Sequence, residues 1–323
     1  MKRIDKIILD DWHPLIPSNS VRECSIVPSR LLGEDLILWK DGSGVNIWQD
    51  LCIHRGSRLS LGWIENNHVV CAYHGWEYDR TGQCVRFPAH PDQRPPEKAH
   101  VKVYESTEKY GLVWASLGKP EREPPKFEEW NDSSFRKILC GPYYYKASAT
   151  RAIENFLDVA HFPYVHEGLL GDRRRPEIND YEVEVSEEGI VAKNVRVWQP
   201  DPDGTGIGKD VVYTYKVLRP FTAYLRKETH EGVLAIFATV TPVDEFNSTA
   251  WLYLAMNYAF EKNEDELRSF QDKITSQDIP VVESQRPERL PLDLQAELHL
   301  RSDRIAIAYR KWLKSMGLSF GTI

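Results

Sequence analysis

Two short motifs constrain this chain most strongly, because each of them pairs one cysteine with one histidine. Cys52-Ile-His54 and Cys71-Ala-Tyr-His74 are separated by sixteen residues. Two thiolates and two imidazoles can hold a [2Fe–2S] cluster, with the thiolates on one iron and the imidazoles on the other. A structural zinc site also uses two Cys and two His, but zinc fingers normally pair Cys with Cys and His with His. The mixed halves therefore favour an iron–sulfur cluster bound by Cys52, His54, Cys71 and His74.

Mixed thiolate and imidazole ligation defines a Rieske cluster. Imidazole is neutral where thiolate is anionic, so such a cluster has a higher reduction potential than an all-cysteine ferredoxin centre. It is suited to accept electrons from a reductase and to pass them to a more oxidising centre. We therefore expect an electron acceptor elsewhere in the chain.

Composition and charge exclude several classes of protein. The chain has 323 residues, of which 41% are hydrophobic and 11% aromatic, enough for one large domain or two domains with well-filled cores. The net charge of −7 argues against nucleic acid or an anionic membrane as the main partner. The N-terminal segment is a poor signal peptide and no apolar run is long enough to span a membrane, so we expect a cytoplasmic protein. The remaining cysteines, Cys24, Cys84 and Cys140, are expected to be buried and reduced.

The pattern of strands, helices and breakers predicts two domains. Short strands and turns fill residues 20–118, and a polar, Pro-rich linker follows at 118–126. We therefore expect an all-β Rieske domain over 1–120 and a second domain over 121–323. The second domain is predicted to be α+β, with a curved antiparallel sheet that can enclose a pocket. Its expected elements are a helix over 151–165, strands over 181–185, 191–197, 211–217, 232–240 and 250–258, and helices over 263–278 and 303–316.

Glycine-rich residues 204–209 resemble a phosphate-binding loop only superficially. They lack both the spacing and the strand-then-helix setting of such a loop, so a surface loop is the better interpretation. No convincing dinucleotide-binding motif is present either. We therefore expect electrons to arrive from another protein.

A second group of potential metal ligands lies in the first helix of the C-terminal domain. Asp158 and His161 are three residues apart, and thus on one face of a helix, while Pro163 would bend or end that helix and bring His166 close. Two histidines with a carboxylate from elsewhere form the facial triad of non-haem Fe(II) oxygenases. By spacing alone, two histidines that cap the helix or satisfy core hydrogen bonds explain the pattern equally well. The cluster upstream favours the iron site, because a cluster that delivers single electrons needs an acceptor.

Together the two motifs resemble the catalytic α-subunits of Rieske non-haem iron oxygenases, over essentially the whole chain. The resemblance implies that His161 and His166 bind a mononuclear Fe(II). It implies that Asp158 does not bind the metal but links His161, by hydrogen bonds, to a Rieske histidine of a neighbouring subunit. It also implies a late aspartate as third ligand. Asp278 fits the segment Gln277–Gln285 best, whereas Asp272 lies among other charges and Glu283 is a weaker candidate.

The resemblance also implies partners and a reaction. We expect an NAD(P)H-dependent reductase that acts directly or through a ferredoxin, a head-to-tail homotrimer, and O₂ with a small organic substrate. The chain's size suggests the α-only branch, and its C-terminal segment looks most like hydroxylases of guanidinium-toxin (saxitoxin-type) pathways. Monohydroxylation at a C–H bond is therefore the main expectation. O- or N-demethylation is the alternative. A Rieske electron carrier and a binding module that has lost its iron are the alternatives from other classes of protein.

Five residues of the predicted strands are candidates for the wall of the pocket: Tyr213, Tyr215, Tyr224, Thr239 and Met256.

Overall fold

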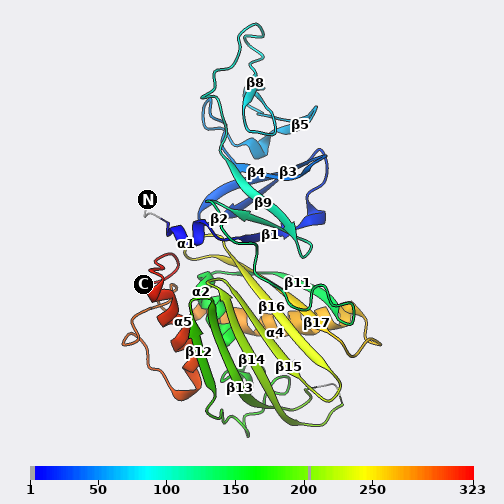
Figure 1. Ribbon diagram of the computed structural model, residues 1–323, viewed down its shortest axis with the longest axis vertical. Coiled ribbons are helices and arrows are strands. Elements are labelled where there is room, and N and C mark those ends of the chain that lie inside the picture. Colours follow the sequence, from blue (N-terminus) through cyan, green and yellow to red (C-terminus); the bar gives the residue numbers. More distant parts are fainter. Residues whose placement is uncertain (1–3, 203–204) are drawn as a thin grey trace. The chain divides into compact units, whose positions relative to one another are not determined.

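The computed structural model describes residues 4–202 and 205–323, which form two compact units (Figure 1). One unit comprises Lys6–Pro124. The other comprises Pro125–Ile323 together with Ile4 and Asp5. Of the glycine-rich segment 204–209, Gly204 lies outside the described residues and Lys209 is the first residue of a strand. None of the helices in the described part of the chain combines the length and the apolar character that crossing a bilayer requires.

The N-terminal unit contains two antiparallel sheets. One has six strands in the order β1-β10-β9-β4-β3-β2, and the other has four in the order β5-β6-β7-β8. One single-turn helix precedes β1, and two others lie between β1 and β2 and between β4 and β5. The elements are α1 (Lys6–Leu9), β1 (His13–Pro17), η1 (Ser18–Ser20), β2 (Ile26–Leu31), β3 (Glu34–Asp41), β4 (Gly44–Gln49), η2 (Leu59–Leu61), β5 (Trp63–Glu65), β6 (His68–Val70), β7 (Glu77–Tyr78), β8 (Cys84–Arg86), β9 (Val103–Lys109) and β10 (Leu112–Ser116).

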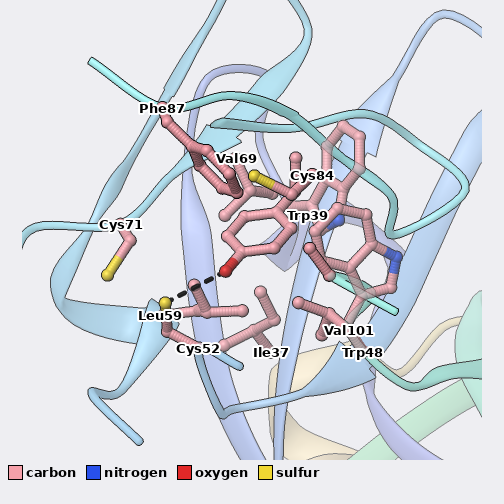
Figure 2. Close-up of a cluster of buried hydrophobic side chains, with 12 residues drawn as sticks. Ile37, Trp39, Trp48, Cys52, Leu59, Val69, Cys71, Cys84, Phe87 and Val101 are labelled. Atoms are coloured by element: carbon pink, nitrogen blue, oxygen red, sulfur yellow. Dashed lines mark hydrogen bonds between the residues drawn. The ribbon is translucent and has the colours of Figure 1, made fainter. Parts of the chain in front are cut away.

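An aromatic core in this unit extends directly to two cysteines. Trp39 of β3 and Trp48 of β4 are fully buried, with their rings edge to face at a centroid distance of 5.1 Å. The same cluster of buried side chains includes Cys52 and Cys71, whose sulfur atoms lie near each other at its edge (Figure 2). The core thus fixes the backbone on which both cysteines are carried.

The C-terminal unit is built on one seven-stranded antiparallel sheet in the order β11-β17-β16-β15-β14-β13-β12. Figure 1 shows α4 behind the strands and α5 beside β12. Helix α2 contacts both α4 and α5, as well as β15, β16 and β17. The elements are β11 (Arg136–Tyr145), α2 (Ala149–Leu157), α3 (Phe162–Val165), β12 (Glu182–Ser186), β13 (Gly189–Gln199), β14 (Lys209–Arg219), β15 (Thr222–Glu228), β16 (Val233–Pro242), β17 (Ser248–Met256), α4 (Glu264–Ser284), η3 (Arg301–Asp303) and α5 (Arg304–Ser315).

A buried ionic network joins α2 to α5. Arg310 of α5 donates from Nε to Glu154 Oε1 at 2.5 Å and from a terminal nitrogen to Glu154 Oε2 at 2.8 Å. The same guanidinium donates to Glu297 at 2.5 Å, and Arg151 donates to the other oxygen of Glu297 at 2.8 Å. Both arginine side chains are at least 97% buried, so each charge depends on its partners for solvation. The network therefore fixes α2, the helix that precedes the histidine segment.

The expected α+β plan, with an N-terminal β domain and a C-terminal antiparallel sheet with helices, is confirmed. The two late helices are also confirmed. Asn263 caps α4 by accepting a hydrogen bond from the backbone N–H of Glu266, and α5 ends two residues before Gly317, which has φ +72°. Helix α4, however, continues through Pro280 to Ser284. The cysteine prediction was wrong for Cys24, which is exposed, whereas Cys84 and Cys140 are buried and unpaired.

The prediction of one continuous helix over 151–165 is confirmed only in part, because α2 ends at Leu157 and α3 begins at Phe162. Asp158 has an extended backbone (φ −84°, ψ +135°), and its Oδ1 accepts the backbone N–H of Ala160 at 2.8 Å. This local side-chain bond competes with the helical pattern and stops the helix. Pro163 does not end a helix but lies in the first turn of α3. Asp158 and His161 thus approach each other across a turn rather than on one helix face.

Candidate iron–sulfur and metal sites

The two Cys–His motifs fold into loops of the same form. In each loop the cysteine carbonyl accepts the N–H of a glycine four residues later, Gly56 or Gly75, at 2.9 Å. The cysteine N–H donates to the carbonyl of the residue that follows this glycine, from Cys52 to Ser57 at 2.8 Å and from Cys71 to Trp76 at 2.9 Å. Both glycines have positive φ (71° and 67°), a conformation that other residues rarely adopt. The shared glycine position explains why motifs of different spacing can present equivalent ligands.

The sulfur atoms of these loops are buried. Cys52 and Cys71 are 2% and 1% exposed. The Cys52 thiol lies beside Cys71 and hydrogen-bonds to it, which lowers the pKa of Cys71 to about 5 and raises that of Cys52. Tyr78 places its hydroxyl 3.0 Å from Cys52 Sγ, shown by the dashed line in Figure 2. Burial, together with Cys52, raises the pKa of Tyr78, so its hydroxyl stays protonated and can donate to a thiolate.

The imidazoles of the two loops lie close together and nearer to solvent. The rings of His54 and His74 are 4.5 Å apart between centroids, and His54 stacks on Trp76 at 4.2 Å. His54 Nδ1 is buried and has no hydrogen-bond partner among the described residues. A buried ring nitrogen without a partner is unfavourable unless something else binds it. Two buried thiols and two adjacent imidazoles, one with an unpartnered nitrogen, fit the ligand set of a Rieske cluster.

In the C-terminal unit, three side chains converge from separate segments. His161 precedes α3, His166 follows it, and Asp278 projects from α4. Their potential ligand atoms all lie within 4.8 Å of one another. Asp278 Oδ1 is 3.0 Å from His166 Nε2 and 3.3 Å from His161 Nε2, and the two Nε2 atoms are 3.2 Å apart.

The other nitrogen of each imidazole is held by a hydrogen-bond acceptor. His161 Nδ1 donates to Asp158 Oδ2 at 2.9 Å, and His166 Nδ1 donates to Gln277 Oε1 at 2.8 Å. With their protons on Nδ1, neutral rings present lone pairs at Nε2, and these lone pairs face each other and the carboxylate of Asp278. Three electron-rich atoms at this separation repel one another unless a cation or a proton lies among them. The three residues thus form a two-His, one-carboxylate ligand set that fits a divalent metal ion.

The electrostatics of His161 and Asp278 agree with this geometry. Burial disfavours the charged form of His161, but the carboxylates of Asp158 and Asp278 outweigh it and raise the pKa of His161 to about 9. Burial acts against the charge on Asp278, yet the two histidines hold its pKa below the usual value. A proton therefore competes with a metal ion for the lone pairs of this site.

The competing candidates for the third ligand lie elsewhere. Asp272 accepts a hydrogen bond from Tyr143 Oη at 2.5 Å, and Glu283 accepts the backbone N–H of Lys146 at 2.8 Å. Of the three carboxylates, the structure brings Asp278 to the histidines. Two partners were not anticipated from the sequence: Tyr78 beside Cys52 and Gln277 beside His166. The signal for Gln277 was its position immediately before Asp278.

A cavity of about 480 Å³ opens onto the three metal-ligand candidates. Its wall combines aliphatic side chains of β16 and β17 with polar and aromatic side chains of β13, β14 and β15, and α2 and α4 complete it. In the alternating pattern of β16, inward-facing Leu234, Ile236, Ala238 and Val240 all contribute. The cavity is therefore apolar on one side and polar on the other.

Three of the five residues expected to line this cavity do so: Tyr213, Tyr215 and Met256. The expectation was wrong for Tyr224 and Thr239, which occupy the opposite phase of their strands. Tyr224 donates to Glu129 at 2.6 Å, and Thr239 hydrogen-bonds to Thr222 at 3.0 Å. Side-chain alternation along a strand sends neighbouring residues to opposite faces, so the sequence pattern alone did not identify the inward phase.

Comparisons with known proteins match the regions of the chain that contain the two candidate sites. The Rieske [2Fe-2S] domain model matches residues 11–105, and the model of the vanillate O-demethylase oxygenase C-terminal domain matches residues 145–318. Methylxanthine N1-demethylase NdmA of Pseudomonas putida is 31% identical over 317 residues, which cover 94% of this chain and 88% of NdmA. Methylxanthine N3-demethylase NdmB of the same organism is 27% identical, covering 99% of this chain and 94% of NdmB.

Solved structures show the same architecture. NdmA with caffeine superposes with a TM-score of 0.82 at 30% identity, covering 96% of this chain and 91% of that one. Dicamba monooxygenase bound to dicamba has a TM-score of 0.77 at 20% identity, covering 96% of this chain and 97% of that one, and so shares the fold.

The fold and the two sites define an iron-dependent oxygenase with a separate electron-transfer cluster. The chain belongs to the Rieske non-haem iron oxygenases. It is accordingly an oxidoreductase that incorporates O₂, with a Rieske [2Fe–2S] domain and a catalytic domain that carries a candidate mononuclear iron site. NdmA and NdmB are demethylases, which favours the demethylase alternative over the hydroxylation that the sequence suggested. The expected likeness to hydroxylases of guanidinium-toxin pathways is not shown.

Proposed function

We propose that this chain is an oxygenase that removes a methyl group from nitrogen in a small, N-methylated heteroaromatic compound. The observation that carries the proposal is its similarity to methylxanthine N1-demethylase NdmA, which extends over 94% of the chain. The match to the vanillate O-demethylase oxygenase C-terminal domain, over residues 145–318, includes the histidine segment and Asp278. The similarity to NdmB, over 99% of the chain, supports it further.

The cavity is compatible with such a substrate. Its volume of about 480 Å³ lies within the range of about 300–1,000 Å³ that small-molecule sites occupy. The aliphatic side from β16 and β17 can pack against the face of a planar ring, and the polar side offers hydrogen bonds to its edge. Because His161, His166 and Asp278 also line the cavity, a methyl group of a bound ring can approach the iron site.

In this proposal His161, His166 and Asp278 hold Fe(II), and Cys52, His54, Cys71 and His74 hold the cluster. Bound iron of this type supplies O₂ activation for attack on a C–H bond. The residues of the chain supply the rest. Three protein ligands leave coordination positions open, acceptors at both Nδ1 atoms keep the Nε2 lone pairs available, and the apolar side of the cavity excludes water.

The net reaction balances with two electrons from outside the chain. An N–CH₃ group, O₂, two electrons and two protons give N–CH₂–OH and water. The N–C bond then breaks, releasing N–H and formaldehyde. The electrons would come from a separate NAD(P)H-dependent reductase, with or without a ferredoxin. A segment of 123 residues, 38% of this chain, is 39% identical to 21% of oxidoreductase NdmD of Pseudomonas putida.

The route of electrons is part of the same proposal. Asp158 accepts a hydrogen bond from His161, and its carboxylate keeps 35% of its surface exposed. A partly exposed carboxylate bonded to an iron ligand is available to a histidine of another subunit. We therefore propose that electrons pass from the Rieske domain of a neighbouring subunit through Asp158 to the iron site. This route requires an oligomer, and a ring-closing homotrimer is the expected form. A cytoplasmic location also stays a prediction.

A single-turnover assay tests the proposed reaction without the reductase. Anaerobic protein, with its cluster reduced by dithionite and the excess removed, is mixed with O₂ and caffeine or theobromine. We expect formaldehyde in equal amount to the N-demethylated product, detected by trapping and by mass spectrometry. A hydroxylated product that retains all methyl groups would instead support C–H hydroxylation. Methoxylated aromatic acids in parallel reactions separate N- from O-demethylation.

A further inference from the structure

A carboxamide, rather than a second carboxylate, supports the more deeply buried histidine of the iron site. We propose that Gln277 is a positioning residue that fixes the tautomer and ring orientation of His166 for metal binding. The inference rests on the proposed iron site, but it concerns how this chain prepares that site. The starting observation is the distance of 2.8 Å between His166 Nδ1 and Gln277 Oε1.

The direction of this hydrogen bond decides which nitrogen can bind a metal. A carbonyl oxygen only accepts, so contact with Gln277 Oε1 places the proton of a neutral His166 ring on Nδ1. Its Nε2 then carries a lone pair directed toward Asp278 Oδ1, 3.0 Å away. The opposite orientation of the amide would donate to Nδ1, move the proton to Nε2 and obstruct metal binding. Gln277 thus selects the binding tautomer only through its oxygen.

The helix α4 supplies both the ligand and this support. Gln277 and Asp278 are consecutive residues of α4, and Ile274 and Val282 on the same helix are buried. Since both side chains start from one rigid helix, the position of the carboxylate and the orientation of His166 are fixed together. His166 is 1% exposed, so water cannot easily replace the amide as its acceptor.

The charges of the site explain why a neutral acceptor suits this position. His161 already has a carboxylate partner, Asp158, which is partly exposed, and Asp278 is 9% exposed. With Fe(II), these two carboxylates and two neutral imidazoles sum to zero charge. A carboxylate at position 277 would add a buried negative charge next to Asp278, which is unfavourable before metal binds. Gln277 orients the ring without that charge.

Metal affinity, measured directly, separates this role from simple packing. Protein with an intact cluster is purified anaerobically, freed of mononuclear metal with a chelator, and brought to equilibrium with radiolabelled Fe(II) by dialysis. The variants are Gln277→Leu, which has a similar shape but no acceptor, and Gln277→Glu, which keeps an acceptor oxygen. Gln285→Leu, at the end of the same helix, controls for loss of an amide from α4. The absorption spectrum of the cluster and circular dichroism check that each variant folds.

We expect Gln277→Leu to weaken Fe(II) binding by about 10–100-fold, the usual cost of losing the partner of a ligand histidine. Gln277→Glu and Gln285→Leu should bind within about 10-fold of the wild-type protein. Unchanged binding by Gln277→Leu, or an equal loss in Gln277→Leu and Gln277→Glu, would overturn the role of the acceptor. His161→Ala is measured in the same experiment. If it binds Fe(II) as tightly as the wild-type protein does, the proposed iron site is wrong, and the role of Gln277 with it.

Discussion

The Nε2 atoms of His161 and His166 lie 3.2 Å apart, although as neutral rings neither can donate a hydrogen bond to the other. Each ring already donates from Nδ1, to Asp158 and to Gln277 respectively. The carboxylate of Asp278 faces both Nε2 atoms, at 3.3 Å and 3.0 Å. This convergence of lone pairs is the strongest structural indication of a metal ion.

The first prediction concerns Asp158. Asp158→Asn keeps an oxygen that can accept from His161 but removes the negative charge available to a second subunit. We expect the mononuclear iron to be retained and oxidation of the reduced cluster by O₂ in the presence of substrate to slow by about 10–100-fold. Stopped-flow absorbance of the cluster and iron analysis measure the two quantities. Loss of iron with unchanged electron transfer would show that Asp158 only orients His161.

The second prediction concerns the cluster potential. The Tyr78 hydroxyl lies 3.0 Å from Cys52 Sγ. With the cluster bound at Cys52, as proposed, this donor should stabilise the more negatively charged, reduced form. Tyr78→Phe removes a hydrogen bond worth about 1 kcal/mol, so the reduction potential should fall by roughly 40 mV for one electron. A redox titration followed by electron paramagnetic resonance measures it. Tyr73→Phe, on an exposed tyrosine, is the control, and equal potentials for both variants would contradict the assignment.

The third prediction concerns the polar side of the cavity. Gln199 is 1% exposed, and its Oε1 has no hydrogen-bond partner within the described ranges. An unsatisfied buried acceptor costs stability, but Gln199→Leu also removes the hydrogen bond that Gln199 Nε2 donates to the Leu170 carbonyl at 3.4 Å, so the free energy of unfolding should change by less than about 1 kcal/mol. If Gln199 hydrogen-bonds to the edge of the substrate, Gln199→Leu should also raise the KM for that substrate by about 10-fold, equivalent to about 1.4 kcal/mol of binding free energy. Thermal unfolding and steady-state kinetics test both parts. Lower stability with an unchanged KM would assign Gln199 a purely structural role.

The fourth prediction concerns the network between α2 and α5. Arg310→Met leaves Glu154 without its main partner in a buried setting, so the free energy of unfolding should fall by about 3–5 kcal/mol. Urea denaturation measures the change. Arg286→Met is the matched control, because that side chain is 63% exposed and its pair with Glu288 should contribute less than about 1 kcal/mol. Similar small losses in both variants would show that Arg310 is not essential to the packing of α2.

Much of the fold could be predicted from the sequence where local chemistry is strong. Asn263 identified the start of α4 and Gly317 the end of α5, each within one or two residues. The end of α4 was not predicted, because the helix continues past Pro280 to Ser284. The strand β15 (Thr222–Glu228) was missed, because Thr222, Ala223, Tyr224 and Leu225 are all buried and show no alternation. Such a run does not distinguish a strand buried on both faces from other core segments.

The candidate ligands could be selected from the sequence, but their geometry could not. Spacing made His161 and His166 candidates, and the upstream Cys–His motifs and the family resemblance favoured them as ligands. Their relation to Asp278 depends on a contact across more than one hundred residues. The turn at Asp158 arises from its bond to the N–H of Ala160, a local competition that helix periodicity does not reveal. The phase of Tyr224 and Thr239 depended on which face of the sheet the helices cover, which is a tertiary property.

The most direct test of the account is the content of iron and acid-labile sulfide per chain, in anaerobically purified wild-type protein and in His161→Ala, each after addition of Fe(II) and removal of unbound metal. A Rieske cluster and one mononuclear iron require about three irons and two sulfides in the wild-type protein. His161→Ala should retain about two of each. Two irons and two sulfides in both proteins would contradict the account, because the convergence of His161, His166 and Asp278 would then bind no iron.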